Sequence, residues 1–124
     1  MARGLQVWSQ TAASNNTIDS GVNWQEGQAP SSVNDSARAE MASMAMWRDD
    51  NNGTVVTTGT TAAYTATSNQ IAAALTNGYT VTLQFHATND SSATFALDGL
   101  AAKNLQLVKG TNLAGGEFAT GSLA

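Results

Sequence analysis

The clearest pattern of apolar and polar positions lies between residues 31 and 49. Pro30 disfavours helical geometry for the residue before it, and Ser31 or Ser32 can cap the first turn. Gly53 can adopt the positive φ that ends helices. Apolar side chains recur every three or four residues in between, which places them on one face of a helix; they are Val33, Ala37, Met41, Met44 and Trp47. The pattern predicts a helix over about 31–49.

A second apolar stripe lies on another face of this helix, formed by Ala39, Ala42 and Met46. A helix that is apolar on two sides usually has neighbours on two sides. A chain of 124 residues offers few other helices, so we expect the second neighbour to be another subunit. The residues expected in an oligomer interface are Val33, Ala37, Met41, Ala42, Met44 and Trp47.

The chain after the helix has the composition of a β-rich module. Runs of β-branched residues and period-two alternation predict strands, at 54–58, 62–67, 79–86 and 93–97, with two more between 105 and 123. Gly59 is expected to separate the first two, and 93–97 is expected to pair back on 79–86. Ser68 is expected to cap a short helix over 69–76, and Asp98–Gly99 predicts a tight turn. The predicted fold class is α+β: an extended N-terminal arm, one long helix, then a β-rich module with one short helix.

Residues 1–30 are polar with isolated apolar positions, and they have two interpretations. They can form a surface strand followed by a loop. Alternatively they form an arm that docks on a neighbouring protein through Leu5, Val7 and Trp8. Trp24 is expected to cover the start of the helix.

Composition narrows the classes of function. Charged residues make up 11% of the chain, the formal net charge is −4, and the five Lys and Arg are scattered. No basic patch can neutralise phosphates, which argues against a nucleic-acid partner. Without cysteine there are no disulfides or thiolate metal sites, and no apolar run is long enough to insert in a membrane. The limited apolar content favours oligomerisation as a way to bury more surface.

The search for chemistry finds no catalytic, cofactor or metal site. His86 is the only histidine and no G-x-S-x-G motif accompanies it, so we expect an exposed or hydrogen-bonded side chain. A minority hypothesis places His86 around a threefold axis as a metal ligand. The run 49–53 offers oxygen atoms without the spacing of a calcium loop. Arg38 has two readings, an exposed pair with Asp35 or a contact to a neighbouring chain.

Two runs carry a resemblance to a known family. Residues 21–38 read G-V-N-W-Q-E-G-Q-A-P-S-S-V-N-D-S-A-R, and residues 8–17 read W-S-Q-T-A-A-S-N-N-T. Both resemble the N-terminal region of tailed-bacteriophage tail fibre and tail spike proteins, in which such a run precedes a helix ending in W-R/Y-D-D. The resemblance is dense over residues 5–50 and looser through 85–89 and 98–100. Family members usually continue beyond the segment similar to 116–123, so the chain is expected to be a short member or a fragment.

The resemblance implies a virion structural protein of the tail that assembles as a homotrimer. It divides the chain into a docking arm at 1–30, an oligomerising helix at 31–50 and a β-rich module at 51–124. The implied partners are other tail proteins (adaptor, nozzle or baseplate), with the host surface reached through a missing or distal part. The implied tail-docking residues are Leu5, Val7, Trp8 and Trp24. The alternatives are a receptor-recognition module that binds host-surface glycan, or a small capsid or neck decoration protein; an enzyme is the least supported reading.

Overall fold

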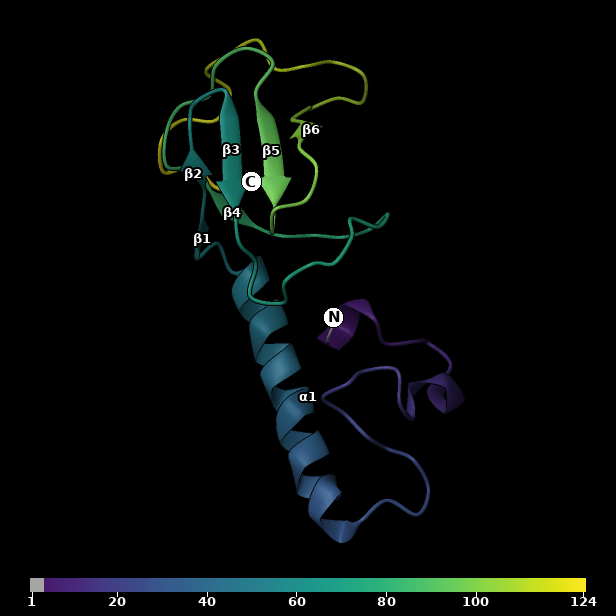
Figure 1. The fold of residues 1–124 in the computed structure, drawn as a ribbon. Helices are drawn as coiled ribbons and strands as arrows, with labels where there is room; N and C mark the ends of the chain where they lie inside the picture. The colour runs from purple at the N-terminus through teal and green to yellow at the C-terminus, as the bar shows by residue number, and fades with distance from the viewer. Residues whose placement is uncertain (1–3) are drawn as a thin grey trace.

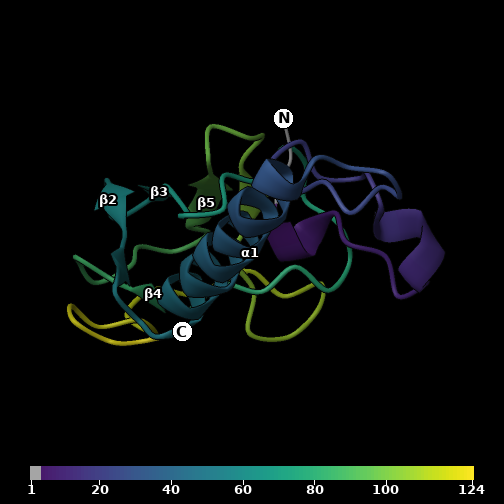
Figure 2. The same cartoon turned by 90° about the horizontal axis from the view of Figure 1, so that it is seen from below.

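The computed structural model describes residues 4–124 and has the predicted α+β architecture. A long helix, α1 (Pro30–Asn51), projects from a β-rich module formed by residues 52–124 (Figure 1). The N-terminal segment lies along one side of this helix in both views (Figures 1 and 2). The 22 residues of α1 span about 33 Å at 1.5 Å per residue.

The predicted helix is confirmed, but its predicted serine cap is wrong. Ala29 is extended, and Pro30 occupies the first helical turn, where its missing N–H is no loss. The Ser32 hydroxyl donates to the Ala29 carbonyl at 2.8 Å instead of accepting a backbone N–H. At the other end Gly53 has φ +82°, which confirms the predicted stop.

Residues 4–29 contain two short 3-10 helices, η1 (Gly4–Gln6) and η2 (Ala12–Asn15), joined by loops. No strand forms between residues 4 and 29, so the interpretation as a surface strand is wrong. The segment packs on α1 at Gly4, where an added Cβ would lie 3.1 Å from Ser43 Cβ.

The β module contains two small sheets. In the first, β1 (Val55–Val56) pairs in parallel with β4 (Leu83–Gln84). The second has the strand order β2-β3-β5-β6; its members are β2 (Thr58–Gly59), β3 (Ala63–Ala66), β5 (Thr94–Leu97) and β6 (Lys103–Asn104). The chain at 121–124 lies beside β4, where Leu83 and Ala124 exchange backbone hydrogen bonds of 2.6 and 2.9 Å.

The predicted strand pairing differs from the observed one. The segment 93–97 does not pair back on 79–86: β5 pairs in parallel with β3, in register Tyr64 to Phe95, and antiparallel with β6. Gly59 does not interrupt the sheet, because it pairs with Tyr64 at φ +92°. A Cβ at Gly59 would lie 2.4 Å from the Ala63 carbonyl oxygen, so the close turn requires glycine.

Three further expectations need correction. Residues 69–76 form no helix, because the amides of Asn69 and Ala72 donate to the carboxylates of Asp50 and Asp98. The strand predicted over 79–86 is paired as a strand only at Leu83–Gln84, since Thr82 N donates to the carbonyl of Asp50. Between 105 and 123 the two predicted strands are isolated bridges. The turn at Asp98–Gly99 is confirmed, with φ of 54° and 76°.

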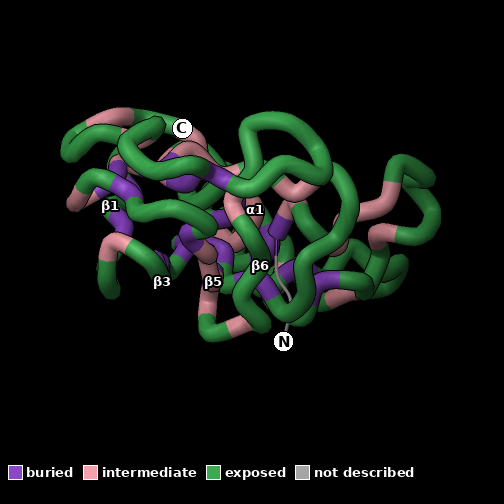
Figure 3. The backbone as a smooth tube through the Cα atoms, turned by 90° about the horizontal axis from the view of Figure 1, so that it is seen from above, coloured by how far each residue is buried: buried purple, intermediate pink, exposed green. Residues whose placement is uncertain are grey.

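The core lies inside the β module as two neighbouring clusters. One contains Val55, Ala66, Leu83 and Leu97, and the other Tyr64, Phe85, Ala93 and Leu113. Phe85 stacks on Phe118 with ring centroids 4.4 Å apart and meets Tyr64 edge-on at 5.0 Å. Leu83 and Phe85 are therefore buried, as the alternation of apolar and polar residues predicts, although the paired strand there spans only Leu83–Gln84. Much of the remaining chain is exposed (Figure 3).

Candidate oligomerisation and docking surfaces

The face that α1 buries within the chain is polar. The three buried residues of the helix are Ser36, Ser43 and Asp50, spaced by seven residues and therefore on one side. Ser36 Oγ accepts from Asn23 N at 2.9 Å and donates to the Asn23 carbonyl at 3.0 Å. Hydrogen bonds and close backbone approach attach this helix to the rest of the chain.

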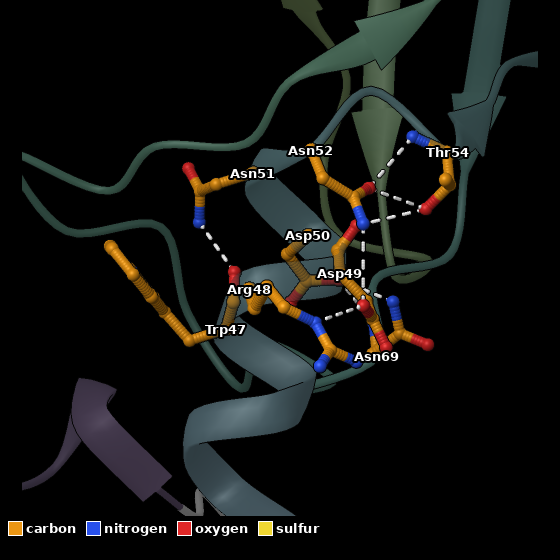
Figure 4. A network of polar contacts seen from close by, with 8 residues as sticks. All are labelled: Trp47, Arg48, Asp49, Asp50, Asn51, Asn52, Thr54 and Asn69. Carbon is orange, nitrogen blue, oxygen red and sulfur yellow. Dashed lines mark hydrogen bonds and ion pairs between the residues drawn. The ribbon is translucent and has the colours of Figure 1, made fainter.

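Asp50 joins the end of α1 to the β module (Figure 4). The residue has no exposed surface, and its carboxylate accepts four hydrogen bonds. Asn69 donates its backbone N and Nδ2 to Oδ1 at 2.6 and 2.8 Å. Gln70 donates its backbone N and Nε2 to Oδ2 at 3.2 and 3.0 Å. The neighbouring Asp49 instead faces Arg48, whose hydrogen bond lowers the pKa of that carboxyl.

The large apolar side chains of α1 lie away from this polar face. Met41 is 66% exposed, Met44 51%, Trp47 44% and Val33 43%, and Ala37 is also exposed. These five residues form one continuous stripe, which we call the open face of α1. They are the residues that the sequence pattern predicts to be in contact with a neighbour. The four large side chains among them thus keep between 43% and 66% of their surface exposed.

Ala42, the sixth predicted interface residue, lies elsewhere. It lines a pocket of about 90 Å³ between α1 and the N-terminal segment, together with Ala39, Met46, Gly4 and Asp19. The second apolar stripe of the helix therefore lies next to the N-terminal segment of the same chain. The open face is the one whose neighbour the chain does not supply.

The predicted tail-docking residues are partly covered. Leu5, Val7 and Trp8 are half-buried, and Trp8 Nε1 donates to Asp19 at 3.1 Å. Trp24 donates its Nε1 to the carboxylate of Glu40, in the middle of α1 and not at its start as predicted. Trp24 remains 38% exposed.

Carboxylates that accept several hydrogen bonds are the feature that the sequence pattern did not identify. Asp19 accepts from Gly4 N at 2.6 Å and Gly21 N at 2.8 Å. Glu117 accepts from Asn89 Nδ2 and from the backbone N of Ala114 and Gly115. The Asn89 bond, followed by the Ala114 amide, lowers the pKa of Glu117 to about 2. The donors that Asp19 and Glu117 meet depend on tertiary contacts, although each of the two residues flanks a turn in the sequence.

The remaining candidates for chemistry have ordinary structural roles. His86 Nδ1 lies 2.8 Å from Thr57 Oγ1, and the ring meets Tyr64 edge-on. Arg38 pairs with Asp35 at 3.3 Å with both side chains 72% exposed, in agreement with the exposed-pair reading. Among residues 4–124, no three acidic, histidine or cysteine side chains gather as a metal site. The helices of the described chain include none with the length and apolarity to cross a membrane.

Comparison of the chain with protein-family models, curated proteins and solved structures finds no match.

Proposed function

We propose that this chain is a virion structural protein of a bacteriophage tail, the tail-proximal part or a short version of a tail fibre or spike. In this proposal three copies associate through the open face of α1. The supporting observation is that Val33, Met41, Met44 and Trp47 present one exposed apolar stripe along a helix that projects from the β module. The trimeric state and the tail as location come from the resemblance of residues 5–50.

The energetics favour association through this face. Full burial of a Val, Met or comparable side chain contributes about 1.5–3 kcal/mol relative to exposure. Four such residues on one stripe form an apolar surface of the kind that marks protein contacts. The small Ala37 lets a neighbouring helix approach closely, while Met41 and Met44 adapt to irregular gaps. The five residues of the open face carry no charge themselves. Two charged residues lie in the same sector of the helix: Glu40, which accepts from Trp24 Nε1, and Arg48, which pairs with Asp49.

The N-terminal segment is the proposed attachment to the tail. Leu5, Val7 and Trp8 lie half-buried beside the helix, and their remaining surface is available to an adaptor, nozzle or baseplate protein. Because Asn23 is hydrogen-bonded to Ser36 of α1 and Gly4 lies against Ser43, the segment would present these residues in fixed positions.

One observation favours the glycan-binding alternative. The exposed ring of Trp24 lines an open groove with Asn16, Gln25 and Glu26. An aromatic ring beside amide and carboxylate groups suits a neutral sugar. Loss of binding to host-derived oligosaccharide by Trp24→Ala, while the same variant keeps its oligomeric mass, would support this alternative over tail docking.

Charge on the open face tests the proposed assembly. The double variant Met41→Glu, Met44→Glu should reduce the oligomer to single chains, because it places carboxylates where apolar side chains meet. The matched control is Leu107→Glu, Val108→Glu, which changes two exposed residues of the β module, 65% and 67% exposed. The control should keep the parental mass in light scattering coupled to size exclusion. An unchanged mass of the α1 variant contradicts association through the open face.

A further inference from the structure

Glycine follows an asparagine or an aspartate at three places in the chain: Asn52–Gly53, Asn77–Gly78 and Asp98–Gly99. At such a pair the backbone nitrogen of glycine can attack the side-chain carbon Cγ of the preceding residue, because glycine has no Cβ to hinder the approach. Both groups belong to one chain, so the rate of attack depends on how freely the side chain can reach that nitrogen. The structure holds the three pairs to different degrees.

Asn52–Gly53, at the end of α1, is held by hydrogen bonds (Figure 4). Asn52 Nδ2 donates to Asp49 Oδ1 at 3.3 Å, and Asn52 Oδ1 accepts from Thr54 N at 3.0 Å and from Thr54 Oγ1 at 2.7 Å. The backbone of Asn52 has φ −100° and ψ 3°. Closing a five-membered ring between Asn52 Cγ and Gly53 N would rotate ψ away from this value and break the three hydrogen bonds.

Asp98–Gly99 is held in a similar way, from the loop that follows β3. The Asp98 carboxylate accepts from Ser68 N and Oγ and from Ala72 N, at 2.6 to 2.7 Å. Rotation of this side chain toward Gly99 N would therefore also cost three hydrogen bonds.

Asn77–Gly78 has none of these restraints. Both residues are exposed, on the loop between β3 and β4 that extends away from the β module (Figure 1). The Asn77 side chain and the Gly78 backbone N form no hydrogen bond within residues 4–124. Gly78 has φ +87°, with open space where a Cβ would lie. The turn is closed by Tyr79 N, which donates to the Thr76 carbonyl at 3.1 Å.

We propose that Asn77 is a site of spontaneous conversion to aspartate and isoaspartate, with water as the second reactant. Gly78 N forms a bond to Asn77 Cγ, the Cγ–Nδ2 bond breaks, and the proton of Gly78 N leaves with the ammonia that is released. The product is a five-membered succinimide. Water then adds to one of its two carbonyl groups, and the ring nitrogen regains a proton as its bond to that carbon breaks. Opening at Cγ gives aspartate, and opening at the backbone carbonyl carbon gives isoaspartate.

The conversion changes the loop in two ways. Each product carries one negative charge more than asparagine, so the formal net charge of the chain goes from −4 to −5. Isoaspartate also places one additional carbon in the backbone of the turn, between Thr76 and Tyr79. The hydrogen bond that closes this turn then no longer spans the same number of backbone atoms.

The test follows both Asn-Gly pairs of the purified chain during incubation at mildly alkaline pH. Mass spectrometry of timed samples, with electron-transfer fragmentation, assigns each converted residue and distinguishes isoaspartate from aspartate. Conversion at Asn77 should be at least about tenfold faster than at Asn52, because attack at Asn52 first breaks hydrogen bonds whose net contribution corresponds to that factor. Equal rates at the two sites, or faster conversion at Asn52, overturn the proposal.

Unfolding provides the control for neighbouring residues. In guanidinium chloride both pairs lose their surroundings, so their rates should become similar; a tenfold difference that persists there would assign it to the local sequence and overturn the structural argument.

The variant Asn77→Gln adds a second readout. It keeps an amide but lengthens the side chain, which disfavours ring closure. The acidic forms that ion-exchange chromatography resolves from the aged parental chain should be absent from aged Asn77→Gln. Their undiminished formation in this variant would contradict Asn77 as the main site.

Discussion

At the scale of single residues, Ile71 has the least favourable backbone conformation for its side-chain type. Of the three non-glycine residues with positive φ in residues 4–124, it alone is β-branched. Asn69 and Ala72, on either side, are held by the carboxylates of Asp50 and Asp98. The surrounding contacts therefore determine this conformation against the local preference of isoleucine.

Replacement of Ile71 by glycine should relieve this strain. Ile18→Gly is the matched control, because Ile18 is also largely exposed, at 43%, and has no positive φ. We expect Ile71→Gly to be more stable than Ile18→Gly by about 1–2 kcal/mol in urea unfolding, since only the first site gains from φ > 0. Equal losses at the two sites would show that Ile71 stores no strain.

Glu117 gives the stability of the chain a defined dependence on acid. Its pKa falls from an ordinary 4.5 to about 2 in the folded state, through Asn89 and the amides of Ala114 and Gly115. A carboxyl with a lowered folded-state pKa stabilises the fold above its unfolded pKa, and this contribution is lost as the pH falls. We expect the urea midpoint to decrease between about pH 4.5 and 2. Glu117→Gln, which does not titrate, should flatten that decrease; an identical pH profile would contradict the assignment.

At the scale of elements, α1 is joined to the β module through Asp50. Asp50→Ala would leave four donors of Asn69 and Gln70 unpaired in a buried place. We expect a loss of about 2–4 kcal/mol in the free energy of unfolding, because bonds to a charged group and buried unsatisfied donors are both costly to lose. The control Asp49→Ala removes an exposed ion pair with Arg48 and should cost less than about 0.5 kcal/mol. Similar losses for the two variants would exclude the proposed role of Asp50.

The elements also show how far the sequence could predict the fold. The periodicity of α1, its end at Gly53 and the Asp98–Gly99 turn are local signals, and all three are confirmed. The helix expected over 69–76 has a suitable apolar spacing, and Ser68 Oγ accepts from Ile71 N at 3.1 Å, as an N-cap does. No helix follows, because the amides of Asn69 and Ala72 donate to the carboxylates of Asp50 and Asp98. Tertiary hydrogen bonds overrode local propensity there.

The pairing of the strands could not be predicted from the sequence either, because it also depends on tertiary contacts. Period-two alternation identifies the inward residues Leu83 and Phe85 but does not say which strand lies beside them. The parallel pairing of β3 with β5 depends on a connection of about thirty residues that contains no regular element except β4. For α1, the pattern of apolar residues does not say which face of the helix is buried within the chain and which is exposed. The structure distinguishes the two, because Ser36, Ser43 and Asp50 occupy the buried side of α1.

At the scale of the whole molecule, the chain has its core at one end and its most exposed apolar helix face at the other. The core clusters lie within the β module, while α1 is attached by polar contacts and presents Met41, Met44 and Trp47 outward. The accessible surface of 7558 Å² therefore includes apolar area that a monomer leaves in water. Association of several copies along α1 would bury the apolar side chains that stay exposed in a single chain.

The solution mass of the chain is the measurement that tests this account most directly. Light scattering coupled to size exclusion should give a mass close to three times the 12.8 kDa of one chain. Because the open face is apolar, the mass should stay the same when salt is raised. A mass of one chain at all concentrations and salt levels would contradict the proposal that the open face of α1 joins copies of this protein.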